Sequence, residues 1–176
     1  MLSLRLFYDI FCLVMQMEKE MPKRKSTRLP KYDYSTNGAY FITICTKEKK
    51  EILCSIVGEG LCALPSIKLT EIGKTVNEAI EYINNIDDVS VDKYVVMPNH
   101  VHMLIAINSG GGGTPPLQVY DIIGRFKSHT NYKSGRPIWQ RSFYDHVIRN
   151  KKDYEEIYRY IEENPAKWQL DIFYSK

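Results

Sequence analysis

Residues 94–105 read YVVMPNHVHMLI, two apolar runs joined by a proline-asparagine pair. Because proline and asparagine favour turns, Val89 to Met97 and His100 to Ile107 are predicted to be two strands connected by a tight turn. Alternate side chains of a strand point to opposite faces, so His100 and His102 are expected to share one face. Two neighbouring neutral imidazoles would form half of a divalent metal site. The alternative is that they are polar residues on the solvent-exposed face of a half-buried strand.

The pattern on either side of this hairpin predicts the rest of the fold. Residues 40–46 form an apolar strand, and residues 52–67, with two glycines, are interpreted as a hairpin-like excursion. Helices are predicted from about residue 69 to 84 and from 117 to 132, separated from one another by the central hairpin and a loop rich in glycine and proline. A strand within residues 138–147 and a last helix complete the order β-α-β-β-α-β-α. This order predicts an α+β fold, a ferredoxin-like (split βαβ) antiparallel sheet with helices on one face plus a C-terminal helix.

The C-terminal helix carries the second chemically informative feature. Asp153 is a candidate N-cap with glutamate three residues later, which fits a capping box. An apolar stripe at helical spacing comprises Tyr154, Ile157, Tyr158 and Ile161 and predicts the core face. Tyr160 falls on the flank of that stripe, and Asn164 follows one turn later, so a phenol and an amide are expected side by side. The alternative is a boundary tyrosine whose ring is packed and whose hydroxyl is in water.

Four segments of the sequence, taken in order, resemble the single-tyrosine HUH transposases. They are residues 97–102 (MPNHVH), 124–128 (GRFKS), 139–146 (WQRSFYDH) and 159–165 (RYIEENP), and the resemblance spans about residues 21–168. It is closest to the branch associated with repetitive extragenic palindromes (REP) in bacteria. The resemblance implies that His100, His102 and Asn164 bind a divalent metal, Mg²⁺ or Mn²⁺, and that Tyr160 is the nucleophile. The insertion-sequence branch has glutamine where this chain has Asn164.

The resemblance further implies metal-dependent nicking and strand transfer of single-stranded DNA, at hairpin or palindromic sequences, through a 5′-phosphotyrosine intermediate. It implies a cytoplasmic protein, a monomer or homodimer, that binds single-stranded or hairpin DNA. It implies no binding to a membrane. Two other functions stay open. One is a non-catalytic nucleic-acid-binding module that uses sheet aromatics, as an RNA-recognition domain does. The other is a metal-dependent phosphodiesterase that activates water and uses Tyr160 only for positioning.

Charge is informative locally rather than globally. With 24 basic and 21 acidic residues the net charge is +3, which implies no strong overall attraction to nucleic acid. Residues 21–31 nevertheless contain five basic residues and no acidic one, and further basic residues lie among aromatics in residues 125–152. Such clusters suit a phosphate backbone with stacked bases, although a solvated basic surface is the alternative. The predicted DNA-binding residues are Lys23, Arg24, Lys25, Arg28, Arg125, Lys127 and Arg141.

Residues 1–20 contain an apolar stretch, Leu2 to Met15, that is interrupted by Arg5 and Asp9 and is too short and too charged for a membrane span. They lack the small-residue cleavage site of a signal peptide. We interpret them as a non-native leader before a single HUH transposase-like domain, residues 21–176; the alternative is an amphipathic helix that docks on the protein or on a partner. The four cysteines include no C-x-x-C pair, which favours free thiols in a reducing cytoplasm.

Overall fold

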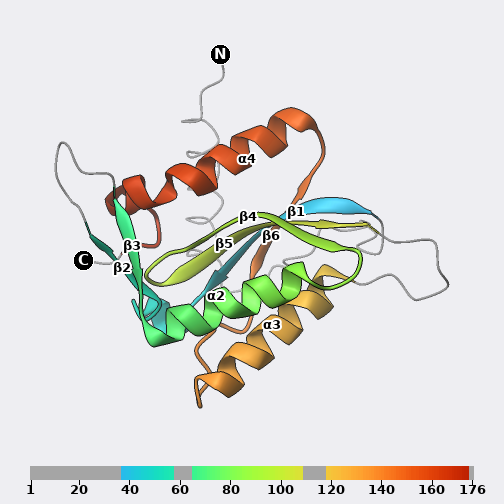
Figure 1. Ribbon diagram of the computed structural model, residues 1–176. Coiled ribbons are helices and arrows are strands. Elements are labelled where there is room, and N and C mark those ends of the chain that lie inside the picture. Colours follow the sequence, from blue (N-terminus) through green and yellow to red (C-terminus); the bar gives the residue numbers. More distant parts are fainter. Residues whose placement is uncertain (1–36, 58–64, 109–117, 175–176) are drawn as a thin grey trace, which may run out of the picture.

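The computed structural model describes residues 37–57, 65–108 and 118–174 (Figure 1). A four-stranded antiparallel sheet has the order β4-β5-β1-β6. Its strands are β1 (Gly38–Cys45), β4 (Val89–Val96), β5 (His100–Ile107) and β6 (Tyr144–Ile148). The helices are α2 (Glu71–Asn84), α3 (Val119–Lys133) and α4 (Lys151–Glu163), with short 3-10 helices at Lys47–Lys49 and Asn164–Leu170. A separate hairpin of β2 (Cys54–Val57) and β3 (Ser66–Leu69) confirms the excursion predicted after β1.

The sheet has the predicted ferredoxin-like topology. β1 lies in the centre between β5 and β6, and β4 forms one edge next to β5. The register between β1 and β5 places Thr43 opposite His102 and Cys45 opposite His100. Residues directly opposite in an antiparallel pair share one face of the sheet, so these four side chains point the same way. The pairing therefore fixes which part of β1 borders the two histidines.

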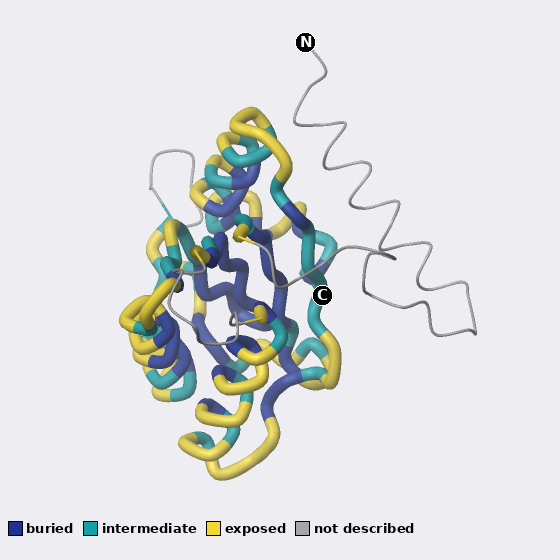
Figure 2. Tube along the Cα trace, turned by 90° about the vertical axis from the view of Figure 1, so that its right-hand side faces the viewer, coloured by how far each residue is buried: buried dark blue, intermediate teal, exposed yellow. Residues whose placement is uncertain are grey.

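Two layers of helices enclose the sheet. α2 and α3 cover one face and α4 covers the other (Figure 1), and the central strands between them are buried (Figure 2). The alternation along the strands explains the two cores, because Ile42 and Met103 belong to the cluster under α2 and α3 whereas Phe41 and Leu104 belong to the cluster under α4. His100 and His102 lie on the α4 face, since Val101 and Met103 between and beside them face the other way.

α2 begins where a polar cap and a close backbone contact coincide. The Thr70 side chain accepts a hydrogen bond from Gly73 N at 3.0 Å and donates to the Ile52 and Leu53 carbonyls. A β-carbon added at Gly73 would lie 1.9 Å from Leu53 O. Glycine is therefore required here by the close approach of the helix to the chain that leads into β2.

Two details predicted for α4 are wrong. The N-cap is Asn150 rather than Asp153, and its side chain accepts a hydrogen bond from Asp153 N. Asp153 lies in the first turn and accepts instead from His146 Nε2 at 3.0 Å and from Arg149 N. The buried face also differs from the predicted stripe: Tyr160 is buried with Ile157 and Ile161, whereas Tyr154 and Tyr158 are half-buried. Tyr160 instead faces the sheet, where its ring packs on Phe41 and its hydroxyl lies 3.3 Å from His102 Nε2.

Several predicted features lie outside the described residues. They are the leader, the basic run with Lys23, Arg24, Lys25 and Arg28, and the glycine-rich loop before α3. The two cysteines within the described part, Cys45 and Cys54, are free thiols. Among the described helices, none combines the length and apolar character that a membrane crossing requires.

Candidate metal centre and tyrosine site

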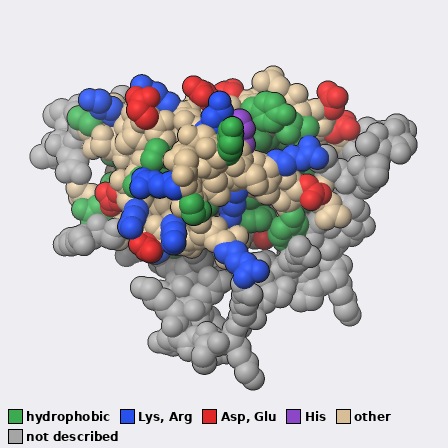
Figure 3. Space-filling view, turned by 90° about the horizontal axis from the view of Figure 1, so that it is seen from below, with side chains coloured by type: hydrophobic (Ala, Val, Ile, Leu, Met, Phe, Trp, Pro, Cys, Tyr) green, Lys and Arg blue, Asp and Glu red, His purple; other side chains and the backbone are tan. Residues whose placement is uncertain are grey.

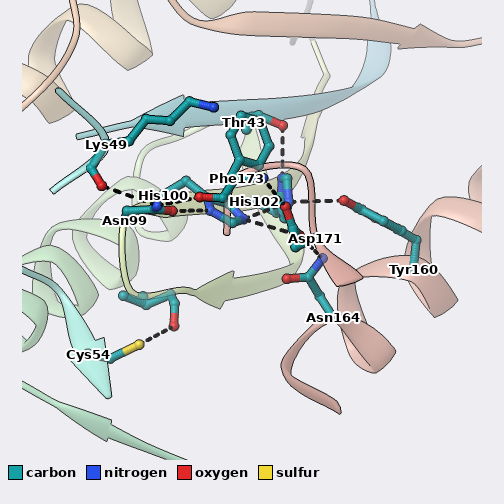
Figure 4. Close-up of polar contacts among 11 residues, drawn as sticks. Thr43, Lys49, Cys54, Asn99, His100, His102, Tyr160, Asn164, Asp171 and Phe173 are labelled. Atoms are coloured by element: carbon teal, nitrogen blue, oxygen red, sulfur yellow. Dashed lines mark hydrogen bonds and ion pairs between the residues drawn. The ribbon is translucent and has the colours of Figure 1, made fainter. Parts of the chain in front are cut away.

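The two histidines of β5 meet through their Nε2 atoms. Both side chains are fully buried beneath α4, and the Nε2 atoms of His100 and His102 are 3.0 Å apart (Figure 4). The strand alternation that places them on one face is the reason they can meet. Their facing ring nitrogens are the centre of the candidate site.

Each imidazole is oriented through its other nitrogen. His100 Nδ1 is 2.9 Å from Asn99 Oδ1, and His102 Nδ1 is 2.8 Å from Thr43 Oγ1. The Asn99 amide nitrogen donates to Phe173 O and Lys49 O, so its oxygen faces His100 and can only accept. His100 therefore carries its proton on Nδ1 and has a lone pair on Nε2, the arrangement that orients histidine ligands in metal sites.

Burial keeps both imidazoles neutral. It lowers the pKa of His102 to about 3, and it lowers the pKa of His100 well below the ordinary value, with His102 and Lys49 adding to the effect. The lone pair of His100 Nε2 therefore faces His102 Nε2, and this contact requires a proton or a cation between the two nitrogens. The 3.0 Å spacing is that of a hydrogen bond between neutral imidazoles, and the same two nitrogens could serve as ligands of one cation.

Asp171 provides a third donor that the sequence analysis missed. It lies just after the 3-10 helix Asn164–Leu170, and its Oδ2 atom is 4.0 Å from His100 Nε2. One ligand atom from each of His100, His102 and Asp171 lies within 4.8 Å of the others, and all three side chains are buried. Asp171 accepts from Phe173 N at 2.7 Å, and burial raises the pKa of its carboxyl. The available signal was an aspartate within an otherwise apolar stretch, residues 170–173.

Asn164, predicted to be the third ligand, lies beside Asp171. Its side-chain nitrogen donates to Asp171 Oδ2 at 3.1 Å, and the residue is 2% exposed. Within the described part of the chain, Asn164 Oδ1 is buried and has no hydrogen-bond donor. A buried acceptor without a partner costs about 1–3 kcal/mol, and a cation would satisfy it. Two imidazole nitrogens, a carboxylate and an amide oxygen together fit a divalent ion such as Mn²⁺ or Mg²⁺.

Tyr160 reaches the same centre from α4. Its hydroxyl oxygen is 3.3 Å from His102 Nε2, and its ring packs edge-on against Phe41 with 5.9 Å between the ring centres. The side chain is 8% exposed. Asn164 follows one helical turn later, so α4 and the residue after it place a phenol beside His102 and an amide beside Asp171 (Figure 4). The structure therefore brings together His100, His102, Tyr160 and Asn164, which were predicted from distant segments.

The C-terminal segment closes the site. The Phe173 ring centre is 4.6 Å from that of His100, and the Trp168 ring centre is 5.9 Å from it. Phe173 is also fixed by its backbone, because its carbonyl accepts from the buried Asn99 amide at 2.7 Å. In this conformation the histidine pair has no contact with solvent.

The predicted DNA-binding residues on α3 and the following connection do not converge on this centre. Arg125 and Arg141 are exposed, and Lys127 Nζ donates to the carbonyls of residues 140–142 at 2.9–3.4 Å. Burial lowers the pKa of Lys127 to about 8. Figure 3 shows basic side chains mixed with acidic ones over the face formed by α2 and α3. Contact of Arg125, Lys127 and Arg141 with DNA stays a prediction.

Comparison with known proteins identifies the family. Residues 34–164 match the family model of IS200-like transposases. An uncharacterized protein of Haemophilus influenzae is 33% identical over 173 residues, 86% of this chain and 93% of that protein. A REP-associated tyrosine transposase of Escherichia coli is 25% identical over 138 residues, 76% of this chain and 70% of that protein. A solved structure of a REP-associated tyrosine transposase bound to a REP hairpin covers 82% of this chain and 76% of its own, with a TM-score of 0.60 and 22% identity.

The family match takes in both histidines, Tyr160 and Asn164, whereas Asp171 lies beyond its end. It also takes in all four strands of the sheet and α2, α3 and α4. The chain therefore belongs to the IS200-like transposase family, and it is a tyrosine transposase similar to the REP-associated members.

Proposed function

We propose that the protein cleaves single-stranded DNA beside a hairpin or palindrome and transfers the cleaved strand to another DNA end, with Tyr160 as the nucleophile. The observation that carries this proposal is the 3.3 Å distance between the Tyr160 hydroxyl and His102 Nε2, beside a group of side chains that could hold a metal ion. The similar transposase of known structure is bound to a REP hairpin, which supports hairpin DNA as the substrate class.

The residues that would hold the divalent cation are His100, His102, Asp171 and Asn164, for the reasons of donor chemistry and the unsatisfied Asn164 oxygen given above. A bound Mg²⁺ or Mn²⁺ would act as a Lewis acid toward the scissile phosphate. Asn99 and Thr43 hold the imidazoles in orientation by their hydrogen bonds to the Nδ1 atoms. Asp171, when ionised, would also offset part of the charge of the cation.

In the proposed reaction the Tyr160 oxygen attacks phosphorus and the bond from phosphorus to the 3′ oxygen breaks. The products are a 5′-phosphotyrosine and a 3′-hydroxyl, so the phenol proton is replaced by phosphorus and the leaving oxygen gains a proton. Because the energy of the phosphodiester bond is conserved in the adduct, a second 3′-hydroxyl can reverse the step and join to the same phosphate. Cleavage and strand transfer thus use one nucleophile.

The alternative functions have less support. An RNA-recognition domain binds bases on an open sheet face, but here α2 and α3 cover one face of the sheet and α4 covers the other (Figure 1). A phosphodiesterase that activates water could use Tyr160 in the same position to orient its substrate. The similarity to REP-associated tyrosine transposases favours the tyrosine reaction over it.

The test is incubation with labelled single-stranded hairpin DNA and Mn²⁺, followed by a denaturing gel. We expect a labelled band at the mass of protein plus DNA that disappears with EDTA and in Tyr160→Phe. Cleavage without an adduct in the wild-type protein would instead indicate the water-using phosphodiesterase. Binding of DNA with neither cleavage nor adduct would indicate a non-catalytic module.

A further inference from the structure

Lys49 lies on a turn whose backbone is strained. Glu48 and Lys49, on the turn that follows β1, have φ angles of 59° and 54°. These angles lie in the left-handed region of backbone conformation, which residues other than glycine rarely adopt. Such a conformation costs on the order of 1–3 kcal/mol per residue and persists only where surrounding contacts impose it. Here Lys49 N donates to Thr46 O at 3.1 Å, and Lys49 O accepts from the Asn99 amide at 3.3 Å. The amide that orients His100 therefore also holds the Lys49 backbone.

The Lys49 side chain extends over Phe173, the ring that covers the candidate metal centre. Its ammonium nitrogen is 5.0 Å from the centre of the Phe173 ring, and that ring is 4.6 Å from His100. In Figure 4 the Phe173 ring lies between the Lys49 side chain and the imidazoles. Lys49 forms no ion pair with any described residue, whereas the neighbouring Lys50 pairs with Glu48 at 2.9 Å.

The charge of Lys49 acts on the centre itself. After burial and His102, it is the next cause that lowers the pKa of His100. It also opposes the burial-driven rise in the pKa of Asp171 and of Cys45, which lies opposite His100 in the sheet. Lys49 is therefore a cation close enough to influence three groups around the histidine pair, although it is not bound to a carboxylate there.

We propose that Lys49 is a substrate-binding residue that contacts the phosphate undergoing attack by Tyr160; this inference rests on the proposed function. Phe173 covers His100, so a phosphate that reaches the histidine pair from this side would take the space that the ring fills. An ammonium group that packs on the outer side of the ring would then face the phosphate instead. Its N–H donors suit the negative charge that builds up on the phosphate oxygens in the transition state, where such contacts have their largest effect.

The first test compares three lysines of one turn. Lys49→Met should lower the rate of adduct formation at saturating DNA by about 10²-fold, the usual effect of losing one donor to a transition-state oxyanion. Lys47→Met and Lys50→Met remove the same charge from exposed positions of that turn and should retain wild-type rates. Lys49→Arg should restore part of the rate. Equal rates for the three methionine variants, with unchanged melting temperatures, would overturn the proposal.

The second test measures binding without chemistry. Once the cleaved linkage is mapped with wild-type protein, that phosphate is replaced by an uncharged methylphosphonate, and affinity is measured in the Tyr160→Phe background. The methylphosphonate should weaken DNA binding in the protein that has Lys49, and it should have little effect on binding in the protein that also carries Lys49→Met. An equal loss of DNA affinity in the proteins with and without Lys49 would mean that its ammonium group does not contact this phosphate. If the wild-type protein forms no adduct at all, the proposed function fails, whereas adduct formation with no Lys49 dependence refutes this inference alone.

Discussion

The Tyr160 hydroxyl lies 3.3 Å from His102 Nε2, although 58 residues separate the two in sequence. β5 supplies the imidazole from the centre of the sheet, and α4 supplies the phenol from the layer above it. Neither group is exposed, so their contact depends on the packing of α4 against this face of the sheet. The same packing positions both the proposed nucleophile on α4 and Asn164, the residue that follows this helix.

Replacement of Tyr160 by phenylalanine tests the nucleophile. Tyr160→Phe should abolish the covalent DNA adduct and leave DNA binding nearly unchanged, because only the hydroxyl beside His102 is lost. The measurement is adduct yield on a denaturing gel alongside a binding titration. Tyr158→Phe is the matched control on the same helix, since Tyr158 is half-buried and packs under Lys93. Adduct from Tyr160→Phe protein would show that another residue is the nucleophile.

Asn164 and the histidines should differ in their effect on metal dependence. Asn164→Ala should raise the Mn²⁺ concentration needed for cleavage without abolishing it, because the two imidazoles and Asp171 remain. His100→Ala combined with His102→Ala should abolish cleavage. Calorimetric Mn²⁺ titration provides a measurement that does not require DNA. Identical metal curves for wild type and Asn164→Ala would exclude its unsatisfied oxygen as a ligand.

Asp171 provides a separate test because it lies outside the family match. Asp171→Asn keeps the size of the side chain and can still accept from Phe173 N, but it removes the negative charge near His100. We expect weaker Mn²⁺ binding by calorimetry and a smaller rise in melting temperature on adding Mn²⁺, since a ligand that binds only the folded state stabilises it by RT ln(1 + [L]/Kd), which falls as Kd rises. An unchanged Mn²⁺ affinity would leave Asp171 a structural residue that anchors the C-terminal segment.

The contrast between Asp171 and the histidines shows what could be predicted from the sequence. The strands and the shared face of His100 and His102 follow from local patterns of apolar residues and turns. Asp171 reaches the site only because residues 164–174 fold back against the sheet, a contact that no local periodicity encodes. The burial of Tyr160 was missed for a related reason, since helical spacing cannot show that the sheet offers a buried partner for a phenol.

The buried histidines should make the metal-free protein sensitive to acid. The pKa of His102 is about 3 in the folded protein because of burial, whereas an imidazole in the unfolded chain titrates near 6.5. Below about pH 6.5 the unfolded state binds a proton that the folded state does not, so stability falls as pH falls, by about 1.4 kcal/mol per pH unit for each such group.

The measurement is urea unfolding in EDTA from pH 7 to pH 4, for wild type and His102→Gln. The variant removes one of these groups and should show a shallower loss of stability with acid. Asp171, whose pKa burial raises, acts in the opposite direction but is present in both proteins, so their difference reports His102. Parallel pH profiles would mean that His102 is not the group whose burial opposes protonation.

Two glycines on different helices provide a test of the packing that supports the site. Gly73→Ala should destabilise the protein by about 1–3 kcal/mol or more, because its β-carbon would lie 1.9 Å from the Leu53 backbone oxygen, a clash that is relieved only if the backbone shifts. Gly124 on α3 has open space around its added β-carbon, so Gly124→Ala should stabilise by up to about 1 kcal/mol through helix propensity. Urea unfolding of both variants measures the difference. Equal stability changes would show that α2 does not approach the residues before β2 as closely as this structure has it.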